Sequence, residues 1–285
     1  MYTCGLAEFG QLGNGETGEY FVTANKIAFA NSNKLERRST FCNGPSACSK
    51  EDVTQKNVPI LSDSALIRIG SVACGKFHVI AVEVQSQECN GQAGPPARVF
   101  SWGCGSYGCL GHGVQVDEYT PRLLGTLQGP IFATNTPLVA AAGSQCSMIR
   151  NLNGHVYYWG KHRSVGEAMM RPSLLEVLAN NRHEVQSFSG GFQTVFAGTK
   201  NGVTIAWGNG GTGELGYGAS QAKSSSKPKF VDKLDSCLVS QISCGYGHTL
   251  FIISDEDEED KKAWAKMSTI ESKDLTSFVE SMTSE

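Results

Sequence analysis

Residues Val99–Gly113 read VFSWGCGSYGCLGHG, an alternating strand that runs into Trp102-Gly103 and then into a glycine-rich turn. Similar text stands at Tyr2–Gly15 (YTCGLAEFGQLGNG) and Ile205–Gly218 (IAWGNGGTGELGYG), and a shortened version at Val156–Gly160 (VYYWG). A repeated segment of this kind is usually one supersecondary unit that buries its apolar face only by stacking on its neighbours. We therefore predict an architecture of stacked repeats before any single motif is interpreted.

A second recurring segment alternates with the first. It reads VACGKFHVIAVE from Val72, AAAGSQCSMIRN from Ala140, SFSGGFQTVFAG from Ser187 and ISCGYGHTLFII from Ile242. We align its glycines as Gly75, Gly143, Gly190 and Gly245, and those of the first segment as Gly5, Gly103, Gly160 and Gly208. The last three units then recur every 47 to 57 residues, close to the length of one four-stranded propeller blade. The sequence predicts an all-β propeller arc of about four blades over residues 1–254.

Composition agrees with a soluble, intracellular, globular protein that is not secreted. The chain has 285 residues, 40% of them hydrophobic, and 33 glycines, which suit tight turns between short strands. It shows neither an apolar run of membrane-spanning length nor a basic and apolar leader after Met1. The ten cysteines lack the Cys-x-x-Cys spacing of a zinc site. Cys74 and Cys244 share one position of the second segment, where Ala142 and Ser189 stand in the other copies, and we expect small buried fillers there.

Charge divides the chain into a body and a tail. The net charge is −3, which separates into −6 for residues 255–285 and +3 for residues 1–254. A body so weakly basic does not favour strong sequence-independent nucleic-acid binding. The tail opens with DEDEED and continues with Leu275, Phe278, Val279 and Met282 on one helical face, so we expect an acidic linker and a short amphipathic C-terminal helix.

Two segments depart from the regular unit. Residues 31–57 are polar and include Lys34, Arg37 and Arg38, which predicts a loop inserted between strands. The third unit lacks the glycine turn after Gly160, and we expect Leu174–Leu178 to form its outer strand.

Several motifs have a structural interpretation. The triplets Gly103, Gly105, Gly108 and Gly208, Gly210, Gly213 match the dinucleotide fingerprint, but no helical pattern follows either one, which favours turns and no cofactor. His78 and His248 share a position held by Cys146 and Gln193 in the other copies, so we expect structural hydrogen bonds from them to a neighbouring strand or blade. Trp102, Trp159 and Trp207 recur in the strand, and we expect them to pack between blades. We find no catalytic or metal-binding constellation in the sequence.

Charges that a propeller does not require are the candidates for partner binding. Asp117, Glu118 and Arg122 follow the glycine turn of one unit, and Lys223, Lys227 and Lys229 follow that of another. Loops on a rigid scaffold commonly carry recognition. The alternative is an ordinary solvated surface, because charged side chains belong there in any soluble protein.

The aromatic-x-Trp-Gly strand, the glycine turn and Cys244–Thr249 (CGYGHT) together resemble the regulator of chromosome condensation repeat family. Within that family the chain is most similar to a mitotic paralogue, through Gly108–Gly113 leading into Asp117–Arg122, Gly213–Gly218 followed by Lys223, and Gly245–Leu250 before a charged tail. The resemblance implies a seven-bladed propeller, of which this chain would supply about four blades.

The resemblance also implies a function. Members of the family bind small GTPases of the Ran, Rac or Ral class, some as guanine-nucleotide exchange factors, and associate with chromatin, centromeres or the spindle. We therefore expect a regulator of small GTPases in mitosis and chromosome or spindle organisation, located in the nucleus and on the mitotic spindle with a cytoplasmic pool. The alternative is a non-catalytic scaffold that binds chromatin or microtubules. The resemblance points to no cofactor, small-molecule substrate or membrane partner.

Overall fold

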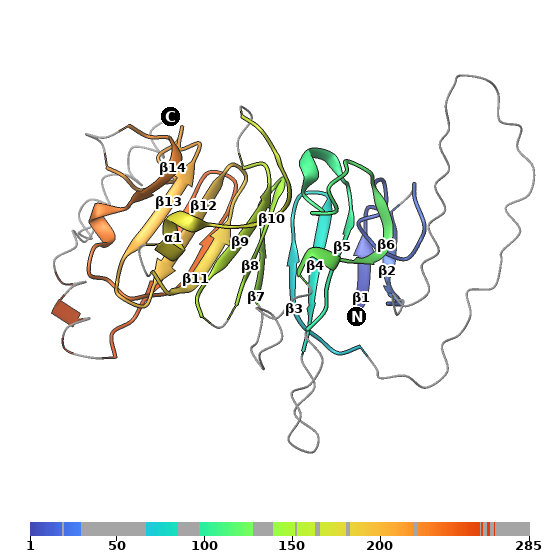
Figure 1. Ribbon diagram of the computed structural model, residues 1–285, viewed down its shortest axis with the longest axis horizontal. Helices are drawn as coiled ribbons and strands as arrows, with labels where there is room; N and C mark the ends of the chain where they lie inside the picture. Colours follow the sequence, from blue (N-terminus) through green and yellow to red (C-terminus); the bar gives the residue numbers. More distant parts are fainter. Residues whose placement is uncertain are drawn as a thin grey trace, which may run out of the picture.

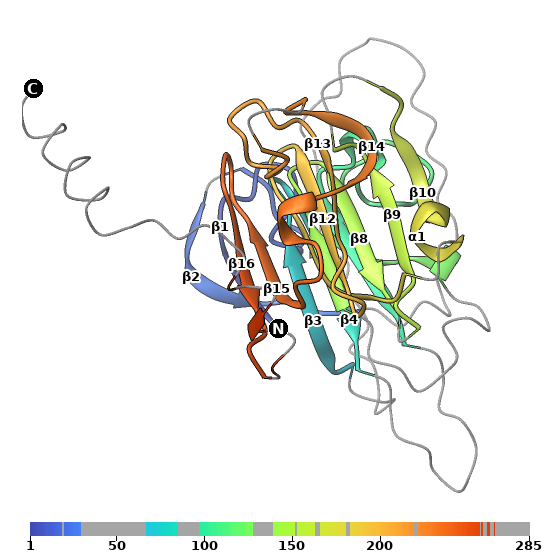
Figure 2. The same ribbon diagram turned by 90° about the vertical axis from the view of Figure 1, so that its left-hand side faces the viewer.

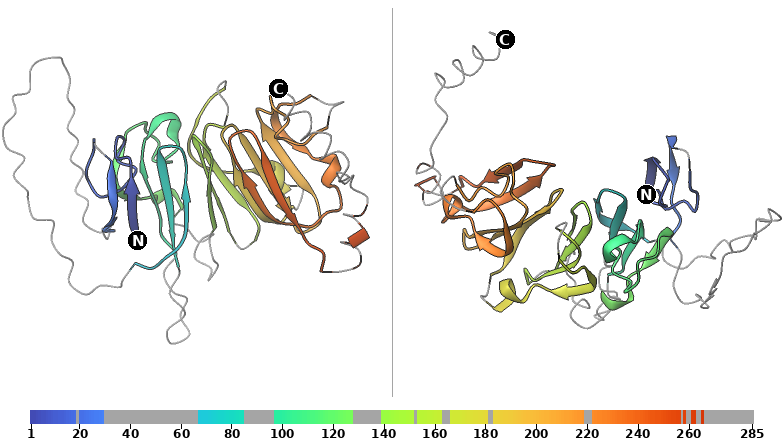
Figure 3. Two further views of the ribbon diagram at one scale, coloured as in Figure 1. Left: turned by 180° about the vertical axis from the view of Figure 1, so that it is seen from behind. Right: turned by 90° about the horizontal axis from the view of Figure 1, so that it is seen from above.

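Five antiparallel sheets follow one another along the chain. The computed structural model describes residues 1–18, 20–29, 67–84, 97–127, 139–151, 153–162, 166–180, 183–218 and 222–256, together with residues 258, 261, 262 and 265. Within these residues the sheets stack side by side in chain order (Figure 1). Seen from above, they fan out along an arc whose two ends do not meet (Figure 3).

Three of the sheets have four strands, each paired with the next in sequence. The first holds β3 (Ile69–Cys74), β4 (His78–Glu83), β5 (Val99–Gly103) and β6 (Glu118–Leu123). The second holds β7 (Val139–Ala142), β8 (Cys146–Arg150), β9 (Val156–Gly160) and β10 (Met169–Leu174). The third holds β11 (Val185–Gly190), β12 (Thr194–Thr199), β13 (Thr204–Gly208) and β14 (Ser225–Phe230). Four consecutive strands of this kind make one propeller blade.

The two terminal sheets have two strands each. The first sheet pairs β1 (Tyr2–Gly5) with β2 (Phe21–Lys26), and the last pairs β15 (Val239–Cys244) with β16 (Thr249–Ile253). Gly5 ends β1 as Gly103 ends β5, so β1 and β2 correspond to the third and fourth strands of a blade. Cys244 pairs with Thr249 as Cys74 pairs with Val79, so β15 and β16 correspond to the first and second strands. The prediction of an all-β propeller arc with about four blades is confirmed.

Short helical turns follow the outer strands. They are the 3-10 turns η3 (Gly125–Leu127) and η5 (Asp232–Leu234) and the helix α1 (Glu176–Asn180), while η2 (Ser106–Gly108) lies in the glycine turn between β5 and β6. No helix in the described part of the chain is long and apolar enough to cross a bilayer.

The hydrophobic core lies between the sheets, as expected for units that bury their faces by stacking. Ile80, Val99 and Leu124 of the first complete sheet meet Ile149 and Trp159 of the second. Corresponding clusters join the second sheet to the third and the third to β15 and β16. Figure 2 views the stack from the side on which β15 and β16 lie. Each blade therefore depends on its neighbours for burial.

Strand pairing corrects our alignment of the second recurring segment. The amide of Gly191 donates to the carbonyl of Thr194 over 2.8 Å, as the amide of Gly75 donates to that of His78 over 2.8 Å. Gly191 therefore holds the position assigned to Gly190, and Thr194 the position assigned to Gln193. The prediction was wrong because two adjacent glycines offer equal sequence matches, and only the ladder of hydrogen bonds selects one.

The outer strand of the second complete sheet also differs from our prediction. β10 spans Met169–Leu174 and pairs with β9, whereas Glu176–Asn180 forms α1. Pro172 lies within β10, where an edge strand tolerates the missing amide donor. Leu175 donates its amide to the carbonyl of Val156 over 2.9 Å and so closes the sheet before the helix begins.

Some expectations fall on residues that the structure does not describe. The insertion predicted at residues 31–57, with Lys34, Arg37 and Arg38, lies outside the described residues. So does the amphipathic face of Leu275, Phe278, Val279 and Met282 in the tail.

Candidate partner-binding face

Four turns, one from each of the last four sheets, meet near the centre of the arc. They join the first strand of each sheet to the second and comprise residues 75–77, 143–145, 191–193 and 245–247. We call them the inner rim. The Lys76 amide donates to the Ser144 carbonyl over 3.2 Å, the Ser144 amide to Gly191 over 3.0 Å, and the Phe192 amide to Gly245 over 3.3 Å. The inner rim is thus a continuous backbone structure, and it lines a cavity of about 400 Å³.

The side chains of the inner rim are aromatic and cationic. Tyr246 is 74% exposed, and its ring stacks on Phe192 with 4.2 Å between centroids. The Lys76 ammonium lies 4.8 Å from the centre of the Phe77 ring, and the centre of the Phe9 ring lies 4.9 Å from it. Exposed aromatic rings held by a rigid backbone are common anchors of protein interfaces.

The glycine turns lie at the same end of the sheets as the inner rim, because each returns the chain from the third strand to the fourth. They lock neighbouring sheets together through the recurring tryptophans. Trp102 Nε1 donates to the Gln11 carbonyl over 3.0 Å, and Trp159 Nε1 donates to the Cys109 carbonyl over 2.8 Å. The backbone of two of these turns also donates to the outer strand of the next sheet, from Gly15 to Tyr119 and from Gly113 to Met170, each over 2.9 Å. Trp207 is buried at 3% exposure and its ring meets that of His162.

His78 links two blades. Its Nε2 lies 2.9 Å from the Ser147 hydroxyl, and that hydroxyl donates to the Cys109 carbonyl over 2.7 Å. Since the hydroxyl proton is used, the ring donates from Nε2, which fixes its tautomer. Burial lowers the pKa of His78 to about 4, although a hydrogen bond with the Cys146 backbone opposes the shift. A histidine that stays neutral at physiological pH serves here as a strut between sheets.

The position equivalent to His78 in the last sheet is exposed to solvent. His248 is exposed, and no described sheet follows β16 to receive it. Cys244 is half-buried, but Cys74 is exposed, so the prediction of a small buried filler is wrong for Cys74. The position opens onto the cavity of the inner rim, and a sequence pattern alone gives no sign of that opening.

Asp117, Glu118 and Arg122 lie together on the outer edge of the first complete sheet. The Asp117 carboxylate accepts a hydrogen bond from the Gly105 amide over 2.7 Å, which holds the glycine turn. Glu118 and Arg122 form an ion pair along β6, with the Arg122 side chain 44% exposed. Asp117 therefore has a structural task, while the Glu118–Arg122 pair faces solvent and is available for recognition.

The three lysines lie elsewhere. Lys223 precedes β14, Lys227 and Lys229 lie within it, and Lys229 stacks over the ring of Tyr217 at 4.7 Å. The sheet β7–β10 separates them from β6. The six candidate residues thus divide into two groups on two blades, and only Asp117, Glu118 and Arg122 are brought together.

Sequence reasoning missed the side chains of the inner rim. Lys76, Phe192 and Tyr246 follow the recurring glycine at corrected, equivalent positions, where the second copy has Ser144. A position whose side chain varies between copies while its backbone stays constant indicates recognition. This variation can be identified only when the copies are aligned correctly.

After Gly108 and Gly213 the chain continues through further turns, without a helix that could face a pyrophosphate. Among the residues that the structure describes, no group of three or more His, Cys, Asp or Glu side chains could hold a metal ion. Burial raises the pKa of the Cys109 thiol well above its usual range, which keeps it protonated.

A profile of the regulator of chromosome condensation (RCC1) repeat matches residues 97–149 and 201–252. Each matched segment starts near a Trp-Gly strand and runs through a glycine turn to the inner strands of the next sheet. The chain is also 30% identical to Protein RCC2 of Homo sapiens over 268 residues, which are 94% of this chain and 46% of the relative. This chain belongs to the regulator of chromosome condensation repeat family. The likeness to RCC2, the telophase disc protein, confirms the paralogue that the repeat motifs indicate.

Solved RCC1-type propellers agree in fold. Human WBSCR16 superposes with a TM-score of 0.57 at 19% identity and covers 89% of this chain and 54% of its own. Prp20p of Saccharomyces cerevisiae, described together with its binding properties to Gsp1p and histones, has a TM-score of 0.50 at 19% identity, over 70% of this chain and 46% of its own. The chain spans about half the length of the curated relatives it matches.

Proposed function

We propose that this RCC1-repeat arc binds a small GTPase through the inner rim and the glycine turns beside it. The observation that carries the proposal is the inner rim itself, in which a hydrogen-bonded backbone presents Lys76, Phe192 and Tyr246 at one end of the sheets. The fold relative Prp20p, whose described properties include binding to Gsp1p, supports a GTPase as the partner class. The Ran, Rac and Ral classes are the candidates.

The proposed activity is nucleotide exchange without covalent chemistry. A surface that binds the nucleotide-free GTPase more tightly than the loaded form weakens the hold on nucleotide by the same factor, since the two binding equilibria are linked. We place this activity in mitosis and in chromosome or spindle organisation, in the nucleus and on the spindle with a cytoplasmic pool, on the strength of the likeness to RCC2.

Release of fluorescently labelled GDP from a panel of Ran-, Rac- and Ral-class GTPases tests the proposal. We expect acceleration for at least one class, and loss of most of it in Tyr246→Ala and Lys76→Ala. Lys233→Ala, at the opposite end of β14 in η5, is the matched control. No acceleration and no binding across the panel, or rim variants that behave like the control, would overturn the proposal.

The Glu118–Arg122 pair offers a separate test of the outer edge of the same face. Because the pair is solvent-exposed and contributes little to stability, Glu118→Ala folds normally. If the GTPase contacts β6, this variant lowers the association rate and the effect shrinks as salt rises. Wild-type exchange rates at all salt concentrations would confine the contact to the inner rim.

A non-catalytic scaffold is the second candidate. Lys223 and Lys227 are exposed on an outer edge, and Prp20p is described with binding to histones as well. A scaffold on chromatin or microtubules predicts sedimentation with nucleosomes or polymerised tubulin that weakens with salt and is lost in Lys223→Ala with Lys227→Ala. Binding that changes neither with the salt concentration nor on substitution of these lysines would refute the scaffold hypothesis.

A further inference from the structure

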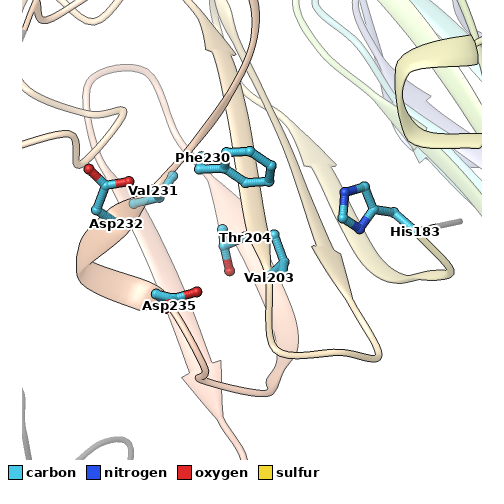
Figure 4. A pocket seen from close by; sticks show the side chains of 7 residues that line it. All are labelled: His183, Val203, Thr204, Phe230, Val231, Asp232 and Asp235. Carbon is cyan, nitrogen blue, oxygen red and sulfur yellow. The ribbon is translucent and has the colours of Figure 1, made fainter. Parts of the chain in front are cut away.

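A cavity of about 510 Å³ lies in the third complete sheet, at the end of the strands opposite the inner rim. Its walls come from the start of β13, the end of β14, the turn η5 and the segment before β11. Figure 4 shows Thr204, Phe230 and Asp235 on one side and the ring of His183 across from them. Nothing in the repeat architecture requires a cavity at this place.

The other two complete sheets show which residue stands at the position equivalent to Thr204. In each complete sheet, the amide of the residue directly after the outer strand donates to the carbonyl of the first residue of the third strand. These bonds run from Leu124 to Val99 over 2.8 Å, from Leu175 to Val156 over 2.9 Å, and from Val231 to Thr204 over 2.9 Å. Thr204 therefore stands where the other two sheets have valine.

All three side chains at this position are at most 2% exposed. Valine satisfies the packing, whereas Thr204 adds a buried hydroxyl that has no hydrogen-bond partner. Leaving a buried hydroxyl unpaired costs about 1–3 kcal/mol. A polar exception that costs stability, in a residue that lines a cavity, is a mark of a ligand site.

Two other residues that line the cavity also differ from the residues at the equivalent positions of the other complete sheets. Phe230 occupies the position of Leu123 and Leu174, and its ring is 52% exposed. Asp235 directly follows Leu234 of η5. At the equivalent position of the second complete sheet, Ala179 directly follows Leu178 of α1. Aromatic and acidic side chains have thus replaced apolar and small ones around the cavity.

His183 completes the wall. By strand register it corresponds to Ile67, since Val185 and Ile69 occupy the same place in their sheets. Its Nδ1 is buried without a hydrogen-bond partner, and its ring meets that of Phe230 edge-on at 6.1 Å. The cavity therefore offers two unpaired polar atoms and a phenyl face, and the Asp232 and Asp235 side chains also line it.

The available groups select the chemistry of the ligand. Carboxylates accept hydrogen bonds only, and a hydroxyl can accept as well as donate, so a ligand rich in donors suits this cavity. A bare metal ion does not fit, because no described group of three acidic, histidine or cysteine side chains could ligate one. A flat cation matches separated acceptors around an aromatic face.

We propose that this cavity binds the side chain of an arginine presented by a partner protein. The guanidinium has five donors in a planar fork, enough to engage Asp235, the Thr204 hydroxyl and His183 Nδ1 while its face lies against Phe230. Lysine has a compact ammonium that cannot reach these separated acceptors together. The site lies away from the inner rim and does not depend on GTPase binding.

Fluorescence anisotropy with three labelled peptides tests the proposal on the full chain: Gly-Ser-Arg-Ser-Gly and its versions with lysine or citrulline in place of arginine. We expect saturable binding of the arginine peptide, and affinity at least about tenfold lower for the other two, which lose the fork or the charge. Equal affinities for the arginine and citrulline peptides, or no binding of any, would overturn the proposal.

Thr204→Val separates recognition from folding, since it restores the residue that the repeat uses elsewhere. Its melting temperature should equal or exceed that of the wild type, while its affinity for the arginine peptide falls about fivefold to tenfold. Asp235→Asn should lose about tenfold, and Glu8→Gln, an exposed carboxylate near the inner rim, should lose nothing. A lower melting temperature for Thr204→Val, or unchanged affinity in both cavity variants, contradicts the proposal.

Discussion

His78 illustrates how a single residue joins two blades of this protein. Its ring donates to Ser147 of the next sheet, which in turn donates to the Cys109 carbonyl in the sheet that carries His78. The three groups form a chain of two hydrogen bonds across the interface. The sequence marks His78 as a recurring structural residue, but it does not reveal its acceptor, because Ser147 is 69 residues away.

Stability should therefore fall in acid through His78. Its pKa is about 4 in the folded protein and about 6.5 unfolded, so the unfolded chain binds the proton first. The contribution is complete above pH 6.5 and is lost as the pH falls toward 4. We expect a loss of about 2 to 3 kcal/mol between pH 7.5 and 4.5, measured by urea unfolding.

Substitution identifies the residue responsible. In His78→Gln we expect lower stability at pH 7.5 and a pH dependence reduced by about that amount. His248→Gln, at the exposed equivalent position, is the control and should unfold like the wild type. An undiminished acid loss in His78→Gln would assign the effect to other groups.

The glycine turn is the element that holds adjacent sheets together. At Gly111 the backbone has φ +76°, and an added Cβ would lie 2.9 Å from Trp159 Nε1. The glycine is thus needed for its conformation and for the close approach of the tryptophan that bonds to Cys109. Gly13 repeats this arrangement beside Trp102.

Gly111→Ala should destabilise the protein by about 2–4 kcal/mol, because the turn is strained and Trp159 is displaced. Gly125→Ala is the matched control, since its Cβ meets no atom within 4 Å, and it should change stability by less than about 0.5 kcal/mol. Thermal unfolding followed by tryptophan fluorescence measures both. Equal melting temperatures for the two variants would refute this account of the turn.

Elements were predictable where the repeat is regular. The strand and glycine turn of residues 99–113 have the expected form, because alternation and glycine placement are local properties. The outer strand after Gly160 was predicted several residues late, since that unit has lost its turn and local pattern no longer fixes the register. Pairing across the sheet settles such cases.

At the scale of the whole molecule, stability should follow position in the arc. Each sheet buries its faces only against its neighbours, so stability is a sum of unit and interface contributions. Within the described residues, the sheet β7–β10 has a complete sheet on either side, whereas β1–β2 and β15–β16 have two strands and one neighbour each. The terminal sheets should therefore open first.

Hydrogen exchange followed by mass spectrometry tests this ordering. Peptides covering β8 and β9 should be the most protected, and those covering β1, β2, β15 and β16 should exchange at least about tenfold faster, in keeping with local opening. The comparison should use only amides that are hydrogen-bonded within a sheet, so that solvent exposure alone does not set the exchange rate. Uniform protection along the arc would contradict the additive picture.

The sequence by itself determined the repeat, the all-β propeller class and the family, because these follow from local alternation, glycine conformation and the spacing of short motifs. Only the tertiary structure decided which glycine of the pair Gly190–Gly191 holds the turn, which side chains form the inner rim, and that Thr204 and Asp235 face a common cavity. Those features depend on hydrogen bonds and contacts between residues distant in sequence, and a linear pattern does not contain the distances between them.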